Sequence, residues 1–116
     1  MTAVDASSGE FSAPALAALV CNLWGQAGEG ARVLDDCIVL VPRLKAVECI
    51  VDEINQVNGA IERLRELASK GEFITVVLPL ENLSAAHQAL YGSGYYVQGW
   101  IDRGDHLPHF MHRELA

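Results

Sequence analysis

The stretch FITVVLPLENLSAAHQALYGSGYYVQGWID, residues 73–102, decides the fold class, because two strands and a helix follow one another within it. Residues 73–80 are apolar and rich in β-branched side chains, which predicts a buried strand. Residues 82–90 predict a short helix closed by glycines, and residues 95–102 again have strand propensity. This order predicts an α/β (α+β) protein with a mixed sheet and helices packed on it.

The segments before this stretch add a helix and another strand. Residues 12–24 predict a helix, because Ser12 is a suitable N-cap and Pro14 lies in the first turn, where its missing N–H is harmless. An apolar stripe at helical spacing supports this helix: Leu16, Leu19, Val20, Leu23 and Trp24. Residues 37–41 form an apolar run that stops at Pro42 and predicts a buried strand.

Residues 43–70 carry the strongest helical periodicity in the chain. Their apolar residues recur at alternating steps of three and four: Val47, Ile50, Ile54, Val57, Ile61, Leu64 and Ala68. The pattern predicts one long helix, which Asn58-Gly59 bends or breaks and Gly71 ends. Two interpretations remain open: the helix packs across the sheet, or its apolar seam joins two copies of the chain in a homodimer.

The chain closes with GDHLPHFMHREL, residues 104–115, in which His106, His109 and His112 stand three apart. The RGD sequence at residues 103–105 predicts a tight turn, and the chain on its two sides predicts an antiparallel hairpin. On a helix His109 and His112 share a face, whereas on a strand residues three apart point to opposite faces. The turn favours a strand, and we therefore expect no metal site here.

The composition indicates a single domain, residues 12–116, after a flexible tail of small and polar residues, 1–11. The formal net charge is −7 and the basic residues are scattered, which argues against nucleic acid or anionic membrane as a partner. We expect neither a signal peptide nor a membrane span. The three cysteines form no CxxC pair, so we expect buried, reduced thiols in a cytoplasmic protein.

The aromatic residues of the strand at 95–102 divide between its two faces. Tyr95 and Val97 share one face, which has the character of core, and Tyr96 and Trp100 share the other. Amphipathic aromatic side chains are favoured at pockets and interfaces. Tyr96 and Trp100 therefore line a ligand pocket or an interface, or they pack under a helix.

The hexapeptide GYYVQG, residues 94–99, fits the G-F/Y-x-x-E/Q-G pattern of the GCN5-related N-acetyltransferases (GNAT). In that family a strand and a short helix precede the motif, and the helix and motif carry residue types that occur here: Asn82, Ala85, Tyr91, Gly94 and Tyr95. The resemblance covers residues 73–116. It implies a GNAT-like C-terminal half, with Tyr91 as the general acid that protonates the leaving thiolate of coenzyme A and Asn82 among the cofactor-binding residues.

The chain departs from the family pattern at two places. The family's spacing puts its tyrosine where Leu90 stands, so Tyr91 is one residue late and is turned by about 100° around a helix. The family also binds the coenzyme A pyrophosphate with a Q/R-x-x-G-x-G/A loop between a strand and a helix. After the strand at 37–41 the sequence reads PRLKAVE, without glycine, and only Arg43 and Lys45 can attract a phosphate there.

Two functional hypotheses follow from these features. The first is a small non-catalytic interaction or regulatory protein, a truncated or degenerate relative of the N-acetyltransferases that dimerises through the long helix or the hairpin. Its partner, a protein or a small molecule, is not identified by the sequence. The second is an acyl-CoA-binding or N-acetyltransferase-like enzyme that uses acetyl-CoA or another acyl-CoA, with Tyr91 as its acid. The missing loop favours the first hypothesis.

Overall fold

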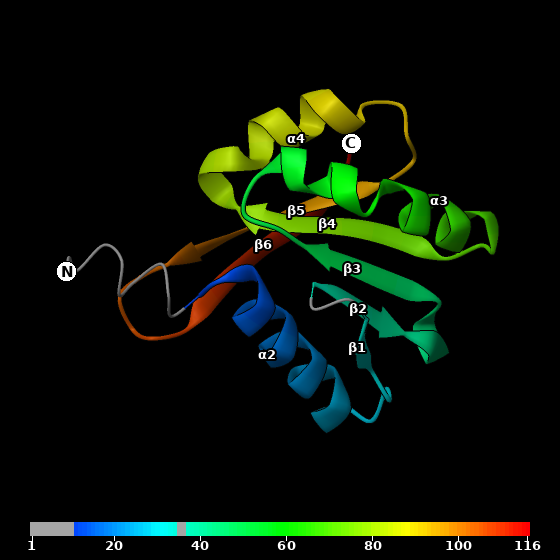
Figure 1. Cartoon of the computed structure of the whole chain (residues 1–116). Coiled ribbons are helices and arrows are strands. Elements are labelled where there is room, and N and C mark those ends of the chain that lie inside the picture. The colour runs from blue at the N-terminus through cyan, green and yellow to red at the C-terminus, as the bar shows by residue number, and fades with distance from the viewer. Residues whose placement is uncertain (1–10, 35–36) are drawn as a thin grey trace.

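A six-stranded mixed sheet with helices on both faces forms the framework of the protein (Figure 1). The computed structural model describes residues 11–34 and 37–116. In chain order the helices, strands and 3₁₀ turns (η) are α2 (Ala13–Gln26), β1 (Arg32–Leu34), β2 (Ile38–Val41), η1 (Pro42–Leu44), β3 (Ala46–Ile50), η2 (Ile54–Gly59), α3 (Ile61–Ser69), β4 (Phe73–Pro79), η3 (Leu80–Asn82), α4 (Leu83–Leu90), β5 (Tyr96–Asp102) and β6 (Pro108–Leu115). The predicted mixed α/β fold is confirmed.

The strands lie side by side in chain order, from β1 to β6. The pairs β3–β4 and β4–β5 are parallel, and the other three pairs are antiparallel. Because β3, β4 and β5 run in the same direction, their carboxyl ends meet at one edge of the sheet. Parallel neighbours need crossover connections, which α3 and α4 supply.

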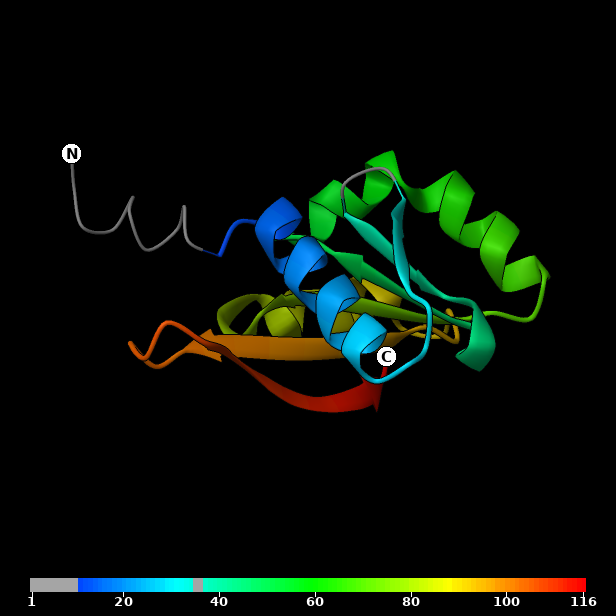
Figure 2. The same cartoon turned by 90° about the horizontal axis from the view of Figure 1, so that it is seen from below.

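Two apolar cores lie on the two faces of the sheet. On one face α3 and α4 cover a core that includes Val47, Leu64, Ile74 and Val97. On the other face α2 covers a core that includes Leu16, Val39, Ile50 and Trp100. Figures 1 and 2 show α3 and α4 on the side of the sheet opposite α2. The central strands are therefore buried on both faces.

The first helix forms as predicted. The Ser12 hydroxyl oxygen accepts a hydrogen bond from the backbone N–H of Ala15 at 3.4 Å, and Pro14 lies in the first turn. The buried stripe is Ala13, Leu16, Ala17 and Val20, while Leu23 of the predicted stripe is 48% exposed. Phe11, which the sequence placed in the flexible tail, is buried, and its ring packs edge-on against Trp100 at 5.5 Å. The rest of that tail, residues 1–10, lies outside the described residues.

The long helix predicted over residues 43–70 is wrong. Its first half contains β3, a central strand, and its second half is split into η2 and α3 at Gly59. All five residues of β3 are buried, so the strand shows no polar alternation. Val47 and Ile50 match a helical step of three although they lie on opposite faces of a strand. The break predicted at Asn58-Gly59 is confirmed, but α3 has only 9 residues, so the long helix that could have carried a dimer seam is not formed.

The second half of the chain agrees with the sequence analysis. The strand, short helix and strand predicted over residues 73–102 are β4, α4 and β5, and the predicted antiparallel hairpin is confirmed by the pairing of β5 with β6. His106 lies in the turn with a φ of +64°. His109 and His112 lie on β6, a strand, as the turn had indicated. In the described ranges no helix has the length and apolar character to span a bilayer.

Candidate functional site

A cleft of about 900 Å³ opens at the edge of the sheet where the carboxyl ends of β3, β4 and β5 meet. Asp52 and Glu53 follow β3, residues 79–82 follow β4, and Trp100, Ile101 and Asp102 end β5, while Phe11 and Ser12 lead into α2. The crevice beyond the carboxyl ends of parallel strands is where open α/β sheets bind ligands.

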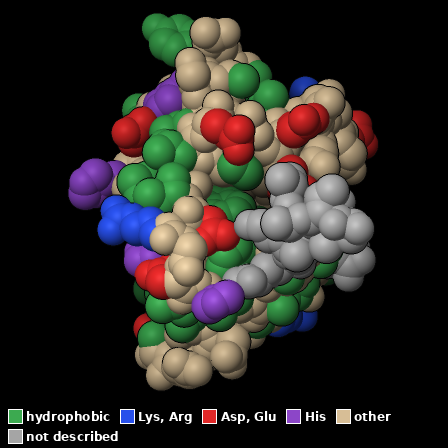
Figure 3. Space-filling view, turned by 90° about the vertical axis from the view of Figure 1, so that its left-hand side faces the viewer, with side chains coloured by type: hydrophobic (Ala, Val, Ile, Leu, Met, Phe, Trp, Pro, Cys, Tyr) green, Lys and Arg blue, Asp and Glu red, His purple; other side chains and the backbone are tan. Residues whose placement is uncertain are grey.

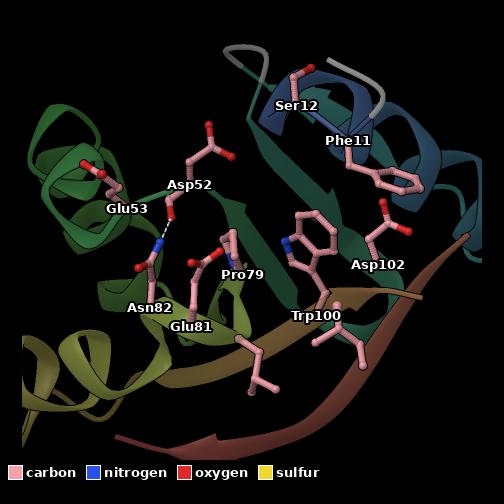
Figure 4. A pocket seen from close by; sticks show the side chains of 11 residues that line it. Phe11, Ser12, Asp52, Glu53, Pro79, Glu81, Asn82, Trp100 and Asp102 are labelled. Atoms are coloured by element: carbon pink, nitrogen blue, oxygen red, sulfur yellow. Dashed lines mark hydrogen bonds between the residues drawn. The ribbon is translucent and has the colours of Figure 1, made fainter. Parts of the chain in front are cut away.

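The cleft forms because β3 and β4 part after their last hydrogen bond. The backbone N–H of Val51 donates to the carbonyl of Val77 at 2.9 Å. One step further, the Asn82 side-chain amide donates to the carbonyl oxygen of Asp52 at 2.6 Å and holds the two parting chains together (Figure 4). A direct hydrogen bond therefore links the segments that follow β3 and β4 at the cleft.

Gly99 lies directly beneath Leu80, one of the residues that line the cleft. A β-carbon at Gly99 would lie 2.9 Å from Cδ1 and 3.3 Å from Cα of Leu80. Only glycine lets the η3 turn pack this closely on β5, and β5 also has an irregular register at this point, between Gln98 and Trp100. Close packing against Leu80 thus explains why the last residue of GYYVQG is a glycine.

The lining of the cleft is acidic. It includes Asp52, Glu53, Glu81 and Asp102, and no lysine, arginine or histidine is among the described residues that line it. In the view onto this face, a hollow with hydrophobic groups at its base is visible, and acidic side chains lie near it together with basic and histidine side chains (Figure 3). Asp102 accepts a hydrogen bond from the Gly104 N–H at 2.7 Å, and Glu53 caps η2. Among the described residues, neither Asp52 nor Glu81 belongs to a salt bridge.

An unpaired hydrogen-bond donor lies in the same cleft. The side chain of Trp100 is 8% exposed, and its Nε1 is buried without a hydrogen-bond partner in the part of the chain that the structure describes. In Figure 4 this nitrogen points toward the middle of the cleft, on the side of Asp52 and Pro79. A buried donor without an acceptor costs about 1–3 kcal/mol of folding free energy. The two alternatives predicted for Trp100 are both realised, since it packs under α2 and lines a pocket.

The residues predicted from the N-acetyltransferase resemblance do not converge. Asn82 lines the cleft, but its side-chain amide already donates a hydrogen bond to the backbone carbonyl of Asp52. Tyr91 is 85% exposed at the far end of α4 and does not line the cleft. Leu90, at the position that the family's spacing gives to tyrosine, is buried in the core. The offset of one residue thus separates a core side chain from a solvent-exposed one.

Arg43 and Lys45 lie at the opposite end of β3 from the cleft. They belong to the turn between β2 and β3, in which Lys45 has a φ of +52°. The Arg43 guanidinium donates to the carbonyl of Gly28 at 2.8 Å. A phosphate site was predicted here on the premise that a helix begins after the strand, and that premise is wrong because β3 follows.

The true junction between a strand and a helix is residues 51–60, from β3 to α3. The side-chain oxygen of Gln56 accepts hydrogen bonds from the backbone N–H groups of Asp52 at 2.6 Å and Glu53 at 3.1 Å. These two N–H groups are therefore not available to an anion. A smaller cavity of about 530 Å³ lies beside the junction, with Gln56, Gly59 and Arg63 in its lining.

Sequence reasoning also missed a buried carboxylate. Glu48 on β3 is 4% exposed, and its Oε2 accepts from Trp24 Nε1 at 2.8 Å and from Arg113 Nη2 at 3.2 Å. These bonds tie α2 and β6 to the central strand on the face that α2 covers. A charged residue in the middle of an apolar run was the available signal, because such a residue is buried only with partners.

Comparison of the chain with protein-family models, with curated proteins and with solved structures gives no match.

Proposed function

We propose that this protein is a non-catalytic relative of the N-acetyltransferases that acts as an interaction or regulatory protein by binding a ligand in the cleft. One observation carries the proposal. The cleft lies where an α/β sheet binds ligands, but its lining is acidic and Tyr91, the expected acid, points into solvent away from it. The cleft thus offers room for a ligand, while Tyr91, the acid expected for acyl transfer from coenzyme A, lies elsewhere, which supports binding without catalysis.

Two stretches of sequence support the proposed relationship to the N-acetyltransferases. GYYVQG leads from the turn after α4 into β5. Gln56-Val57-Asn58-Gly59 occupies the junction between β3 and α3, and it matches the first four positions of the family's Q/R-x-x-G-x-G/A loop. The last position of that loop is Ile61 instead of glycine or alanine. A degenerate phosphate loop at this junction agrees with a relative that does not use the coenzyme.

The electrostatics of the junction and the cleft disfavour a polyanionic coenzyme. A pyrophosphate is normally held by free backbone N–H groups at a helix N-terminus. Here the side-chain oxygen of Gln56 accepts hydrogen bonds from the backbone N–H groups of Asp52 and Glu53, so neither is free for a phosphate. Glu62, in the first turn of α3, adds a negative charge that repels one. The cleft adds several carboxylates that repel phosphate, and each such pair at 4 Å in water costs about 1 kcal/mol.

The alternative function is that of an acyl-CoA-binding or N-acetyltransferase-like enzyme. The observation that favours it is the Gln56-x-x-Gly59 match, because it places a glycine where the family's loop approaches the coenzyme. Under this alternative the Gln56 side chain moves away from the backbone N–H groups of Asp52 and Glu53, which then bind the pyrophosphate. Acetyl-CoA or another acyl-CoA is the cofactor.

Thermal unfolding of the full chain with and without acetyl-CoA separates these two functions. A ligand at 100 times its dissociation constant raises the free energy of unfolding by about 2.7 kcal/mol. We expect no change in melting temperature at millimolar acetyl-CoA. A saturable rise that Gln56→Ala alters but the distant Arg43→Gln does not would contradict the non-catalytic proposal and support the enzyme.

The proposal includes a homodimer in the cytoplasm, formed through the hairpin. The support is that β6, 8 residues long, is the last strand of the sheet, and that Leu107 and Leu115 on the hairpin are 58% and 62% exposed. An edge strand offers unpaired backbone groups to a second strand. The buried Cys49, whose pKa burial raises to about 12, suits a protein with reduced thiols. Light scattering over a range of concentrations tests the dimer, and a monomer throughout would exclude it.

A further inference from the structure

We propose that Cys37 and Cys49 form a dithiol that a hydroperoxide oxidises to a reversible disulfide bond between the start of β2 and the end of β3. Cys37 is the thiol that reacts with the peroxide, and Cys49 is the thiol that closes the bond. This modification site does not involve the cleft, so it goes beyond the proposed function and does not depend on it.

The backbones of the two cysteines lie on neighbouring segments of the sheet. The Cys37 carbonyl accepts a hydrogen bond from the N–H of Ile50 at 2.8 Å, and Cys49 lies opposite Ile38 in the pairing of β2 with β3. The α-carbons of paired antiparallel residues are about 4.5–5.5 Å apart, and a disulfide accepts about 4.4–6.8 Å. An offset of one residue, about 3.4 Å along a strand, keeps the two cysteines near the upper end of that range. The strands can therefore stay paired when the bond forms.

The two thiols also meet on the same face of the sheet. Cys49 belongs to the core that α3 and α4 cover, and Cys37 packs against that core. The thiols are hydrogen-bonded to each other. Cys37 precedes β2, which begins at Ile38, so the alternation of a strand does not turn its side chain to the other face. The sulfur atoms thus lie side by side before any oxidant is present.

Access from outside differs between the two thiols. Cys49 is buried, whereas Cys37 is partly buried and lines the cavity of about 530 Å³ beside the junction of β3 and α3. Glu62 and Arg63 line the same cavity. A hydroperoxide is small and uncharged, so neither of these charges keeps it out. Oxidation of a thiol follows its exposure, and Cys37 is therefore the thiol that reacts first.

The chemistry takes two steps and consumes one hydroperoxide. The Cys37 sulfur attacks one peroxide oxygen, the O–O bond breaks, and a sulfenic acid forms while the other oxygen leaves with the thiol proton as water or an alcohol. The Cys49 sulfur then attacks the Cys37 sulfur, the S–O bond breaks, and hydroxide leaves with the Cys49 proton as water. Two thiols are oxidised to a disulfide and the peroxide is reduced, so no further reactant is needed.

The acidity of Cys49 suits the second step rather than the first. Burial, and after it the charge and the hydrogen bond of Cys37, raises the pKa of the Cys49 thiol to about 12. Cys49 therefore stays protonated at neutral pH and does not attack peroxide itself. Once Cys37 is an uncharged sulfenic acid, its charge no longer opposes the ionisation of Cys49, which favours closure of the bond.

Cys21 provides a control within the same chain. Like Cys37 it is partly buried, but it lies on α2 and packs against the core on the opposite face of the sheet. The sheet therefore separates its thiol from the Cys37–Cys49 pair. Peroxide can oxidise Cys21, but the folded chain should not link it to either of the other two cysteines.

The test is treatment of the full chain with hydrogen peroxide, alkylation of the remaining thiols and tryptic digestion without reductant. Trypsin cleaves at arginine and lysine, so the three cysteines fall in separate peptides, residues 1–32, 33–43 and 46–63. We expect mass spectrometry to find peptides 33–43 and 46–63 joined, two hydrogens lighter than their sum, and to find them separate after dithiothreitol. Peptide 1–32 should be joined to neither.

Three variants assign the two roles. Cys49→Ala should leave on Cys37 a sulfenic acid that dimedone traps, because the second thiol is missing. Cys37→Ser should leave Cys49 unoxidised in the folded chain, because no peroxide reaches it. Cys21→Ser should form the bridge as the unchanged chain does. A dimedone adduct on Cys49 in the Cys37→Ser chain would overturn the assigned order of the two thiols.

The unchanged chain alone decides whether the pair exists. The same treatment in urea should distribute the links over all three pairs of cysteines, since the fold no longer holds Cys37 beside Cys49. A folded sample that gives this same distribution would overturn the proposal. So would the absence of the 33–43 to 46–63 link at a peroxide concentration that oxidises Cys21. A mixture of ¹⁴N and ¹⁵N chains should give links within one chain only, and mixed-isotope links would also overturn it.

Discussion

The two indole groups of this protein lie in polar surroundings of opposite kinds. Trp24 on α2 donates to Glu48 at 2.8 Å, and Arg113 donates to the same carboxylate at 3.2 Å, so the donors and the acceptor of this buried group are matched. Trp100 on β5 lies in a cleft with several carboxylates, yet its Nε1 has no partner within the described residues. The first set of groups joins three elements and stabilises the fold. The second leaves the Trp100 donor without an acceptor, and Asp52 and Glu81 without a salt bridge, among the described residues.

The difference follows from the position of each set in the sheet. Glu48 lies in the middle of a central strand, where α2 and β6 can reach it from two directions. The cleft lies beyond the ends of the strands, where β3 and β4 part and no further element covers them in the described structure. Polar groups in the middle of the sheet can thus be satisfied by the fold itself, while those at its edge are satisfied by solvent or ligand.

Removal of the buried carboxylate should have the largest effect. Glu48→Ala leaves the Trp24 indole and the Arg113 guanidinium without their acceptor, and breaking a buried charge pair is strongly destabilising. Arg113 is 40% exposed and recovers some hydration, so we expect a loss of about 2–4 kcal/mol in the free energy of unfolding. Urea unfolding measures this loss. Glu48→Gln, which keeps an acceptor for Trp24, should lose less, and a loss below about 1 kcal/mol for the alanine variant would contradict this account.

The two tryptophan variants test the comparison directly. Trp24→Phe removes a donor from a buried carboxylate and should lower the free energy of unfolding by about 1–3 kcal/mol. Trp100→Phe removes a donor that has no acceptor, so the relief of its desolvation cost offsets the lost packing, and we expect a change within about 1 kcal/mol of zero. Urea unfolding of both variants gives the difference. A larger loss for Trp100→Phe than for Trp24→Phe would show that the Trp100 N–H is satisfied in solution.

A methyl group at Gly99, beneath the cleft residue Leu80, should have a smaller effect. Gly99→Ala places a β-carbon 2.9 Å from Cδ1 and 3.3 Å from Cα of Leu80, which forces the η3 turn away from β5. We expect a loss of about 1–2 kcal/mol in the free energy of unfolding. Gly25→Ala is the matched control, because a β-carbon there meets nothing within 4 Å and the residue lies in α2. The control should stabilise by about 0.5–1 kcal/mol. Equal effects of the two changes would remove the steric reason for Gly99.

The sequence predicted elements wherever one local signal was sufficient. The cap of Ser12 and the apolar stripe located α2, and glycines and β-branched runs located β4, α4, β5 and β6. The central strand β3 was missed because both of its faces are buried, which removes the alternation that identifies a strand. Its apolar residues then joined those of α3 in a false helical period. A strand of 3 residues, β1, carries too little pattern to be recognised.

The cleft was only partly predictable for the same reason. Asp52 and Glu53 fell inside the false helix, so their place at the end of a strand was hidden. Once β3 is known, the carboxyl ends of three parallel strands define the position of the cleft, and Asn82 and Trp100, which the sequence analysis had singled out, both line it. The misplacement also hid Gln56-x-x-Gly59, because the phosphate loop was sought after β2 instead of β3. The unpaired state of Trp100 depends on tertiary contacts and has no local signal.

The exposed carboxylate of Asp105 gives the smallest effect and the other extreme of the comparison with Glu48. The ring Nε2 of His109 lies 2.8 Å from its Oδ2 on the surface of the hairpin. That hydrogen bond lowers the pKa of Asp105 below its ordinary value. The resulting stabilisation is present above the pKa of the unfolded chain, about 3.9, and is lost as the pH falls through the lower pKa of the folded state. Because solvent screens this pair, the effect should be visible in the titration of its carboxyl ¹³C signal rather than in unfolding. We expect His109→Ala to raise the titration midpoint toward the ordinary range, while the N–H of Leu107 still donates to Asp105, and His112→Ala, a change further along β6, to leave it lowered. A midpoint that His109→Ala leaves unmoved would show that this exposed hairpin contact does not persist in solution.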